Sequence, residues 1–168
     1  MTKKQYILLS VSLFISLFIY LFYRTEKTVV NELIIRLVSY PVYISLKNFI
    51  GSSIPLNNIF IYSLPEGLWV FCITLTSKAY YVQYKNRYFD CTYIPLALCI
   101  TLELLQLLHV TNGRFDYIDI AIFVLFWVLA RYRFCGNNKK QHLLNKPNYS
   151  TLVCVISYGI VYLAHVMK

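Results

Sequence analysis

Charge is what this sequence has little of. Asp, Glu, Lys and Arg make up only 14% of its 168 residues, whereas about a quarter is usual in soluble domains. Hydrophobic residues account for 58% and aromatic residues for 17%, and the mean hydropathy is +0.56. This composition excludes an ordinary soluble domain and is typical of a polytopic membrane protein. We expect one membrane domain over residues 1–168.

The sequence also lacks the short motifs that identify common enzymes and metal sites. It contains no H-E-x-x-H, G-x-S-x-G or P-loop pattern, and its five cysteines are scattered without a C-x-x-C pair. The net charge is +9, but the basic residues lie beside hydrophobic runs, where they favour anionic lipid headgroups over nucleic acid. We therefore expect membrane lipids as partners, no nucleic acid, no metal and no cofactor.

Five hydrophobic segments have about the length that a bilayer core requires. The predicted spans are residues 6–23, 65–81, 93–110, 116–132 and 149–167. Pro65 and Pro95 suit the first turns of the second and third spans, where a missing N–H does no harm. Residues 83–92 are polar and are expected to form a loop. The sequence therefore predicts an all-α, polytopic membrane helical bundle.

Residues 28–50 form an additional segment that fits the membrane interface. Apolar residues recur on one helical face, while Glu32 and Arg36 lie off it. Pro41 ends this amphipathic helix, and a second interfacial or re-entrant piece follows it. The alternative is a true span over residues 33–50, which would bury Arg36 and Lys47 in hydrocarbon.

The distribution of basic residues predicts the orientation. With five spans and a cytoplasmic N-terminus, the inner segments carry ten of the sixteen Lys and Arg residues. The positive-inside rule prefers this arrangement. We expect a multi-pass protein of the bacterial inner membrane, with the corner between the third and fourth spans on the outer side.

Polar residues gather at that corner and at the start of the second span. A carboxylate deep in a membrane helix costs about 2.5 to 3.5 kcal/mol unless it faces a partner or a wet cavity. Glu103 and Gln106 are three residues apart and share one helix face, as do Asp116 and Asp119. The predicted ligand-binding residues of one outer pocket are Glu66, Glu103, Gln106, Arg114, Asp116 and Asp119.

Each of these residues also has a structural interpretation. Glu66 and Asp119 would complement a helix dipole in the first turn of a helix, and Asp116 would be an N-cap. Arg114 would be an interfacial anchor. Glu103 has no such local explanation, so its alternative is an interhelical hydrogen bond or ion pair.

The segment Glu103-Leu-Leu-Gln106, followed by Arg114 and then Asp119 at the head of the next apolar helix, resembles the signature of VanZ-like membrane proteins. The similarity covers roughly residues 60 to 132. It implies four or five spans and a role in the bacterial cell envelope.

Three functions stay open from the sequence. The first is a binding protein whose outer polar pocket takes an anionic or lipid-linked envelope ligand, with Arg114 on the anionic group. The second is a membrane-embedded enzyme acting on an envelope lipid or glycan carrier, with Glu103 as general acid or base and Asp119 as its partner. The third is an accessory scaffold of a membrane complex. Whether the protein is an enzyme is left open.

Overall fold

The computed structural model describes residues 3–24, 29–110, 115–134, 141–142 and 149–165. Within them the chain forms seven α-helices, a short π-helix and three strands. The helices are α1 Lys3–Tyr23, α2 Val29–Val38, α3 Tyr40–Ser53, α4 Asn58–Ser77, α5 Tyr93–Leu107, α6 Tyr117–Val128 and α7 Tyr149–His165. The π-helix η1 covers Leu129–Arg133. The strands are β1 Tyr80–Tyr84, β2 Arg87–Asp90 and β3 Gln141–His142.

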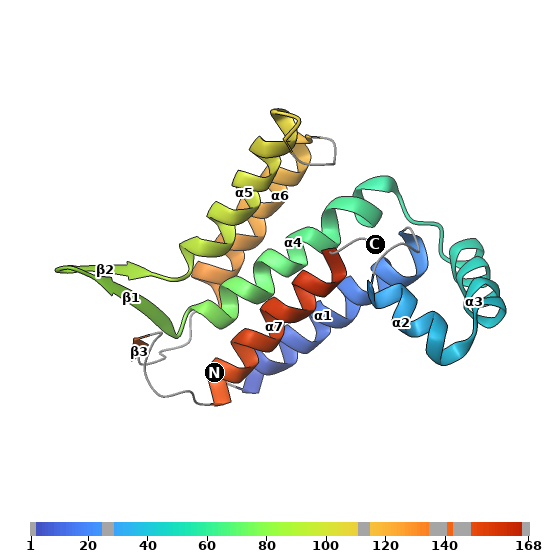
Figure 1. Cartoon of the computed structure of the whole chain (residues 1–168), viewed down its shortest axis with the longest axis horizontal. Helices are drawn as coiled ribbons and strands as arrows, with labels where there is room; N and C mark the ends of the chain where they lie inside the picture. The colour runs from blue at the N-terminus through green and yellow to red at the C-terminus, as the bar shows by residue number, and fades with distance from the viewer. Residues whose placement is uncertain (1–2, 25–28, 111–114, 135–140, 143–148, 166–168) are drawn as a thin grey trace.

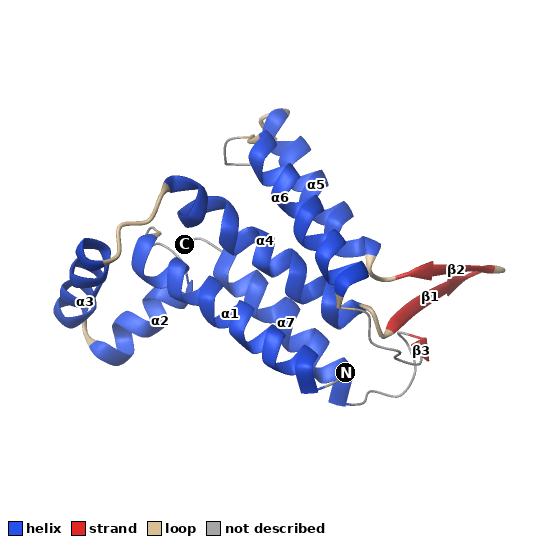
Figure 2. Ribbon diagram, turned by 180° about the vertical axis from the view of Figure 1, so that it is seen from behind, coloured by secondary structure: helices blue, strands red, loops and turns tan. Residues whose placement is uncertain are grey.

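Helix α4 is the centre of the fold. It contacts α1, α5, α6, α7 and η1, and every residue from Gly67 to Ser77 is buried. A helix that is hydrophobic on all sides must be covered on all sides, by protein or by lipid. Helices α1 and α7 lie along α4, while the α5–α6 pair crosses it at a steep angle (Figures 1 and 2).

The helix that carries Pro65 begins earlier than predicted. α4 starts at Asn58, so Pro65 lies inside the helix and not in its first turn. The apolar run before the proline continues the helix, and a neighbouring hydroxyl adds a hydrogen bond at this point. Ser16 of α1 is fully buried and donates to the carbonyl oxygen of Pro65 at 3.2 Å. This bond joins α1 to α4 beside the proline, whereas the hydrogen bond that Pro65 cannot make is the one from its own nitrogen to the carbonyl oxygen of Ile61.

The all-α prediction is wrong in one detail, because the end of the second predicted span and the polar loop after it form a β-hairpin. β1 and β2 pair antiparallel with Tyr84 opposite Arg87, which leaves Lys85 and Asn86 as a two-residue turn. Lys85 has a φ of 52°, as tight hairpin turns require. β3 adds to β1 in parallel, so the sheet order is β2-β1-β3.

Among the described residues, two helices are long and apolar enough to cross a membrane, α1 and α4. α2 and α3 meet at a bend of 113° and count as a third candidate if they form one broken span. The bend lies at Ser39, directly before the tyrosine–proline pair that opens α3. α5 is apolar but has only 15 residues. These helices indicate a membrane location.

Candidate functional site

A polar cavity lies where the end of α1, the start of α4, the end of α5 and the start of α6 meet. Its volume is about 480 Å³. Its lining residues are Arg24, Asn58, Ile59, Tyr62, Ser63, Glu66, Glu103, Gln106, Asp116, Ile118 and Asp119. Four carboxylates and one guanidinium are therefore concentrated in one hollow of a chain that is otherwise poor in charge.

Gly67 allows the helices to approach closely enough to form this site. A Cβ atom at Gly67 would lie 2.5 Å from Cγ2 of Ile122 and 2.6 Å from Cδ2 of Phe126, both on α6. Real Cβ atoms are not found that close to other heavy atoms, so only glycine fits there without a shift of its neighbours. The neighbouring residue Glu66 is thereby brought close to Asp119 of α6.

Glu103 links α5 to the start of α6 through a hydrogen bond. It is only 4% exposed, and its Oε2 accepts a hydrogen bond from the backbone N–H of Asp116 at 3.2 Å. Asp116 in turn caps α6, because its side chain accepts from the N–H of Ile118 at 2.8 Å. The prediction that Asp116 is an N-cap is confirmed. Two backbone N–H groups at the start of α6, those of Asp116 and Ile118, thus donate to carboxylates.

Arg24 is the cavity residue that the sequence interpretation missed. Its Nη1 lies 3.1 Å from Oε1 of Glu66, with both side chains about one-fifth exposed. The guanidinium also lies over the rings of Tyr20, at 4.5 Å, and Tyr62, at 5.4 Å. A signal was available, because Arg24 directly follows the first predicted span, whose end was expected on the same membrane side as the predicted pocket.

The ion pair also corrects the interpretation of Glu66. A role in the first turn of a helix is wrong, because Glu66 lies in the interior of α4 and pairs with Arg24. Glu66 is therefore a partner in a contact between helices, which its position in the sequence alone did not indicate.

Three carboxylates are crowded together at the centre of the site. One oxygen each from Glu66, Glu103 and Asp119 lies within 4.8 Å of the other two. Oδ1 of Asp119 is buried and has no hydrogen-bond partner among the described residues. Carboxylate oxygens this close repel one another and together accept N–H or O–H donors or a small cation. Within the described part of the chain, these three residues are the set that could hold a metal ion.

Five of the six predicted pocket residues therefore line one cavity, including both candidate catalytic residues, Glu103 and Asp119. Arg114 lies outside the described residues. No known protein family, curated protein or solved structure matches this chain. The resemblance to VanZ-like proteins therefore stays a prediction.

Proposed function

We propose that this chain is a multi-pass protein of the bacterial cell envelope whose cavity binds the polar headgroup of a lipid-linked or amphipathic ligand. The observation that carries the proposal is the convergence of four carboxylates and Arg24 on a cavity of about 480 Å³ between apolar helices. Because charged groups inside a membrane are costly, they mark functional sites more often than packing contacts. The VanZ-like resemblance supports the same role, since three of its four signature residues line the cavity: Glu103, Gln106 and Asp119.

The proposal includes five spans and a cytoplasmic N-terminus. α1 and α4 are long and apolar enough to cross the membrane, while α5, α6 with η1, and α7 have 15, 17 and 17 residues. At 1.5 Å per residue these helices reach about 22 to 26 Å, close to a hydrocarbon core of about 30 Å. With the basic residues at the start of α1 and the end of α4 on the inner side, as the positive-inside rule prefers, the cavity would lie in the outer half of the membrane.

The charges of the described residues indicate which chemical groups the cavity would recognise. Carboxylates outnumber the single arginine, and that arginine is already paired with Glu66. Acceptors in such excess suit a headgroup rich in O–H and N–H donors, such as a glycan or a peptide. An anionic group of the same ligand would be the partner of Arg114, and we expect Arg114→Ala to weaken ligand retention without preventing membrane insertion.

The test is to identify the lipids that remain bound to the purified protein. The full chain is extracted in mild detergent, and co-purifying lipids are quantified by mass spectrometry. We expect one lipid class to be enriched over total membrane extract, and we expect Glu103→Gln and Asp119→Asn to reduce that enrichment. Glu32→Gln is the matched control, because Glu32 lies on α2 outside the cavity, paired with Arg36. Equal enrichment in the cavity variants and the control would contradict the proposal.

The short distance between carboxylates favours an enzyme as the second candidate. Glu103 and Asp119 have oxygens within 4.8 Å of each other, a spacing at which two carboxyl groups act as an acid–base pair. In this alternative Glu103 would transfer a proton to or from a lipid-linked envelope carrier, and a neighbouring arginine would stabilise developing negative charge. Turnover of such carriers by purified protein, lost in Glu103→Gln, distinguishes the enzyme from the binding protein.

A further inference from the structure

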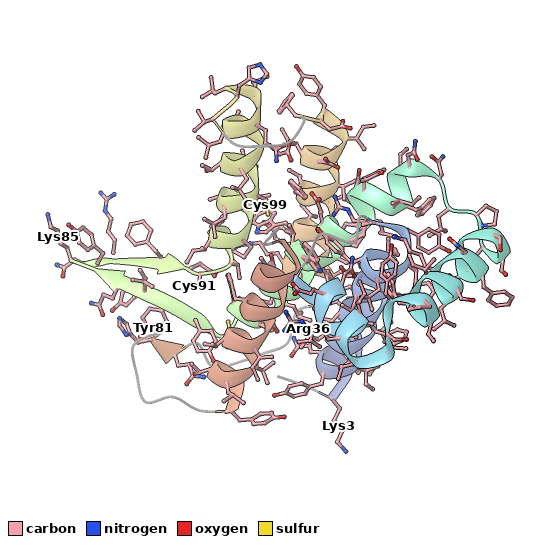
Figure 3. All side chains as sticks on the ribbon, turned by 45° about the vertical axis from the view of Figure 1, so that its right-hand side comes forward. Lys3, Arg36, Tyr81, Lys85, Cys91 and Cys99 are labelled. Carbon is pink, nitrogen blue, oxygen red and sulfur yellow. The ribbon has the colours of Figure 1, made fainter. Side chains whose placement is uncertain are left out.

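The β1–β2 hairpin projects from the helices and exposes large aromatic side chains. It leaves the bundle at the end of α4, and Lys85 stands at its tip (Figure 3). Tyr84 is 64% exposed, Tyr88 70% and Phe89 54%. Aromatic side chains in membrane proteins are enriched at the level of the lipid headgroups, where their rings meet the apolar region and their polar atoms meet water.

One face of the hairpin combines two of these aromatic rings, those of Tyr84 and Phe89, with positive charge. Residues directly opposite each other in an antiparallel pair point to the same side of the sheet. Val82 lies opposite Phe89 and Tyr84 opposite Arg87, so these four residues share one face. Lys85 adds a second cation, with its Nζ 5.6 Å from the centre of the Tyr84 ring.

An open groove runs beside this hairpin. It has a volume of about 400 Å³ and lies between β2 and the start of α5. It is lined by Tyr88, Phe89, Asp90, Tyr93, Ile94 and Ala97. The only charge in the lining is Asp90, whose Oδ2 lies 3.8 Å from Nη1 of Arg131. The remaining walls are aromatic or aliphatic, which suits an acyl chain.

The surrounding residues make this end of the molecule basic. The cations at the start of α1, the end of α4, the hairpin and the end of α6 with η1 are Lys3, Lys4, Lys78, Lys85, Arg87, Arg131 and Arg133. Asp90 is the one carboxylate among the described residues of these segments, and it is balanced by Arg131. The field at this membrane face therefore attracts negative charge.

We propose that the β1–β2 hairpin and the adjoining groove form a binding site for an anionic phospholipid. Lys85 and Arg87 contact its phosphate, the exposed aromatic rings lie at headgroup level, and an acyl chain follows the groove beside α5. Charge complementarity selects the lipid class, because a zwitterionic headgroup offers no net negative charge to two exposed cations. The site is separate from the polar cavity at the other end of α4 and does not depend on what that cavity binds.

The test places a fluorescent reporter on the hairpin of the full-length protein. Tyr84→Trp keeps an aromatic ring at an exposed position, and bromine on lipid chains quenches tryptophan fluorescence on contact. The protein is reconstituted into vesicles of phosphatidylcholine and phosphatidylglycerol in which one or the other lipid is brominated. The signal of Trp69 and Trp127 is measured in the parent chain and subtracted. The ratio of the two quenching efficiencies reports which lipid lies at the hairpin.

We expect brominated phosphatidylglycerol to quench the reporter more strongly than brominated phosphatidylcholine at the same mole fraction. Arg87→Gln should lower this preference roughly fivefold, because one cation near an anionic lipid surface contributes about 1 kcal/mol. Arg36→Gln, the same change at an exposed position on α2, should leave it unaltered. Equal quenching by the two lipids, or a preference that survives Arg87→Gln, would overturn the proposal. So would the absence of quenching by either lipid, because it would place the hairpin in water or on another protein.

Discussion

Gly67 offers the sharpest test of how the cavity is built. Replacing it by alanine places a Cβ atom 2.5 Å from Cγ2 of Ile122 and 2.6 Å from Cδ2 of Phe126. Because these distances are shorter than any real Cβ contact, the two side chains or α6 itself must shift to admit the methyl group. Forcing extra atoms into a packed core costs about 1 to 3 kcal/mol.

Helix propensity favours alanine over glycine and therefore offsets part of this steric cost. The two contributions to the free energy of unfolding must be measured separately. Alanine in a helix is more favourable than glycine by about 0.5 to 1 kcal/mol. Gly51 of α3 and Gly159 of α7 provide the correction, because a Cβ atom at either position meets nothing within 4 Å. We therefore expect Gly51→Ala and Gly159→Ala to be neutral or stabilising, and Gly67→Ala to lie about 1 to 3 kcal/mol below them.

The measurement is the free energy of unfolding of the purified protein in mixed micelles, titrated with a denaturing detergent. Ile122→Ala removes the atom closest to the new Cβ, so the double variant Gly67→Ala/Ile122→Ala should lose less than the sum of the two single losses. The Gly67 argument fails if Gly67→Ala is as stable as the two control variants. It also fails if the losses of the double variant simply add, because the steric contact would then not be the cause.

Two further predictions concern the charged contacts of the site. Arg24→Ala leaves Glu66 without its ion-pair partner in a largely buried position, and should lower the free energy of unfolding by about 1 to 3 kcal/mol. Glu66→Gln in the same chain should recover part of that loss, whereas no recovery would show that Arg24 acts through its ring contacts. Asp116→Ala removes the N-cap of α6 and should cost about 1 kcal/mol. Asp116→Asn keeps the acceptor and should cost less in a thermal unfolding measurement, so equal losses would contradict the capping role.

The helical, membrane-associated character of the chain could be predicted because it depends on local composition. The first predicted span matches α1 closely, and the segment over residues 28–50 does consist of two helices joined at a bend next to Pro41. Asp116 could be predicted as an N-cap for the same reason, because an N-cap is recognised from the residue and the apolar run that follows it. The carboxylates within or beside the apolar helices could also be singled out as pocket residues from the sequence, because hydrocarbon disfavours a charged group wherever it occurs.

The errors share a different cause. α4 begins at Asn58 and not near Pro65, because a helix packed against several neighbours tolerates the loss of the one hydrogen bond that proline cannot donate. The hairpin at residues 80–90 was missed, because its first residues were assigned to the second span and residues 83–92 to a polar loop. Arg24 was missed because its ion-pair partner, Glu66, lies 42 residues away in the chain.

The sequence by itself determined that this protein consists of apolar helices suited to a membrane. It also determined that the few charged side chains within those helices must lie between helices and away from hydrocarbon. Hydropathy and helical periodicity act over neighbouring residues, so they can be read without knowing how the chain folds. Only the tertiary structure decided which polar groups meet, because that depends on how closely helices approach at Gly67 and on which side chains α1, α4, α5 and α6 present to one another. Distances between helices arise from packing across the whole bundle, and no local stretch of residues encodes them.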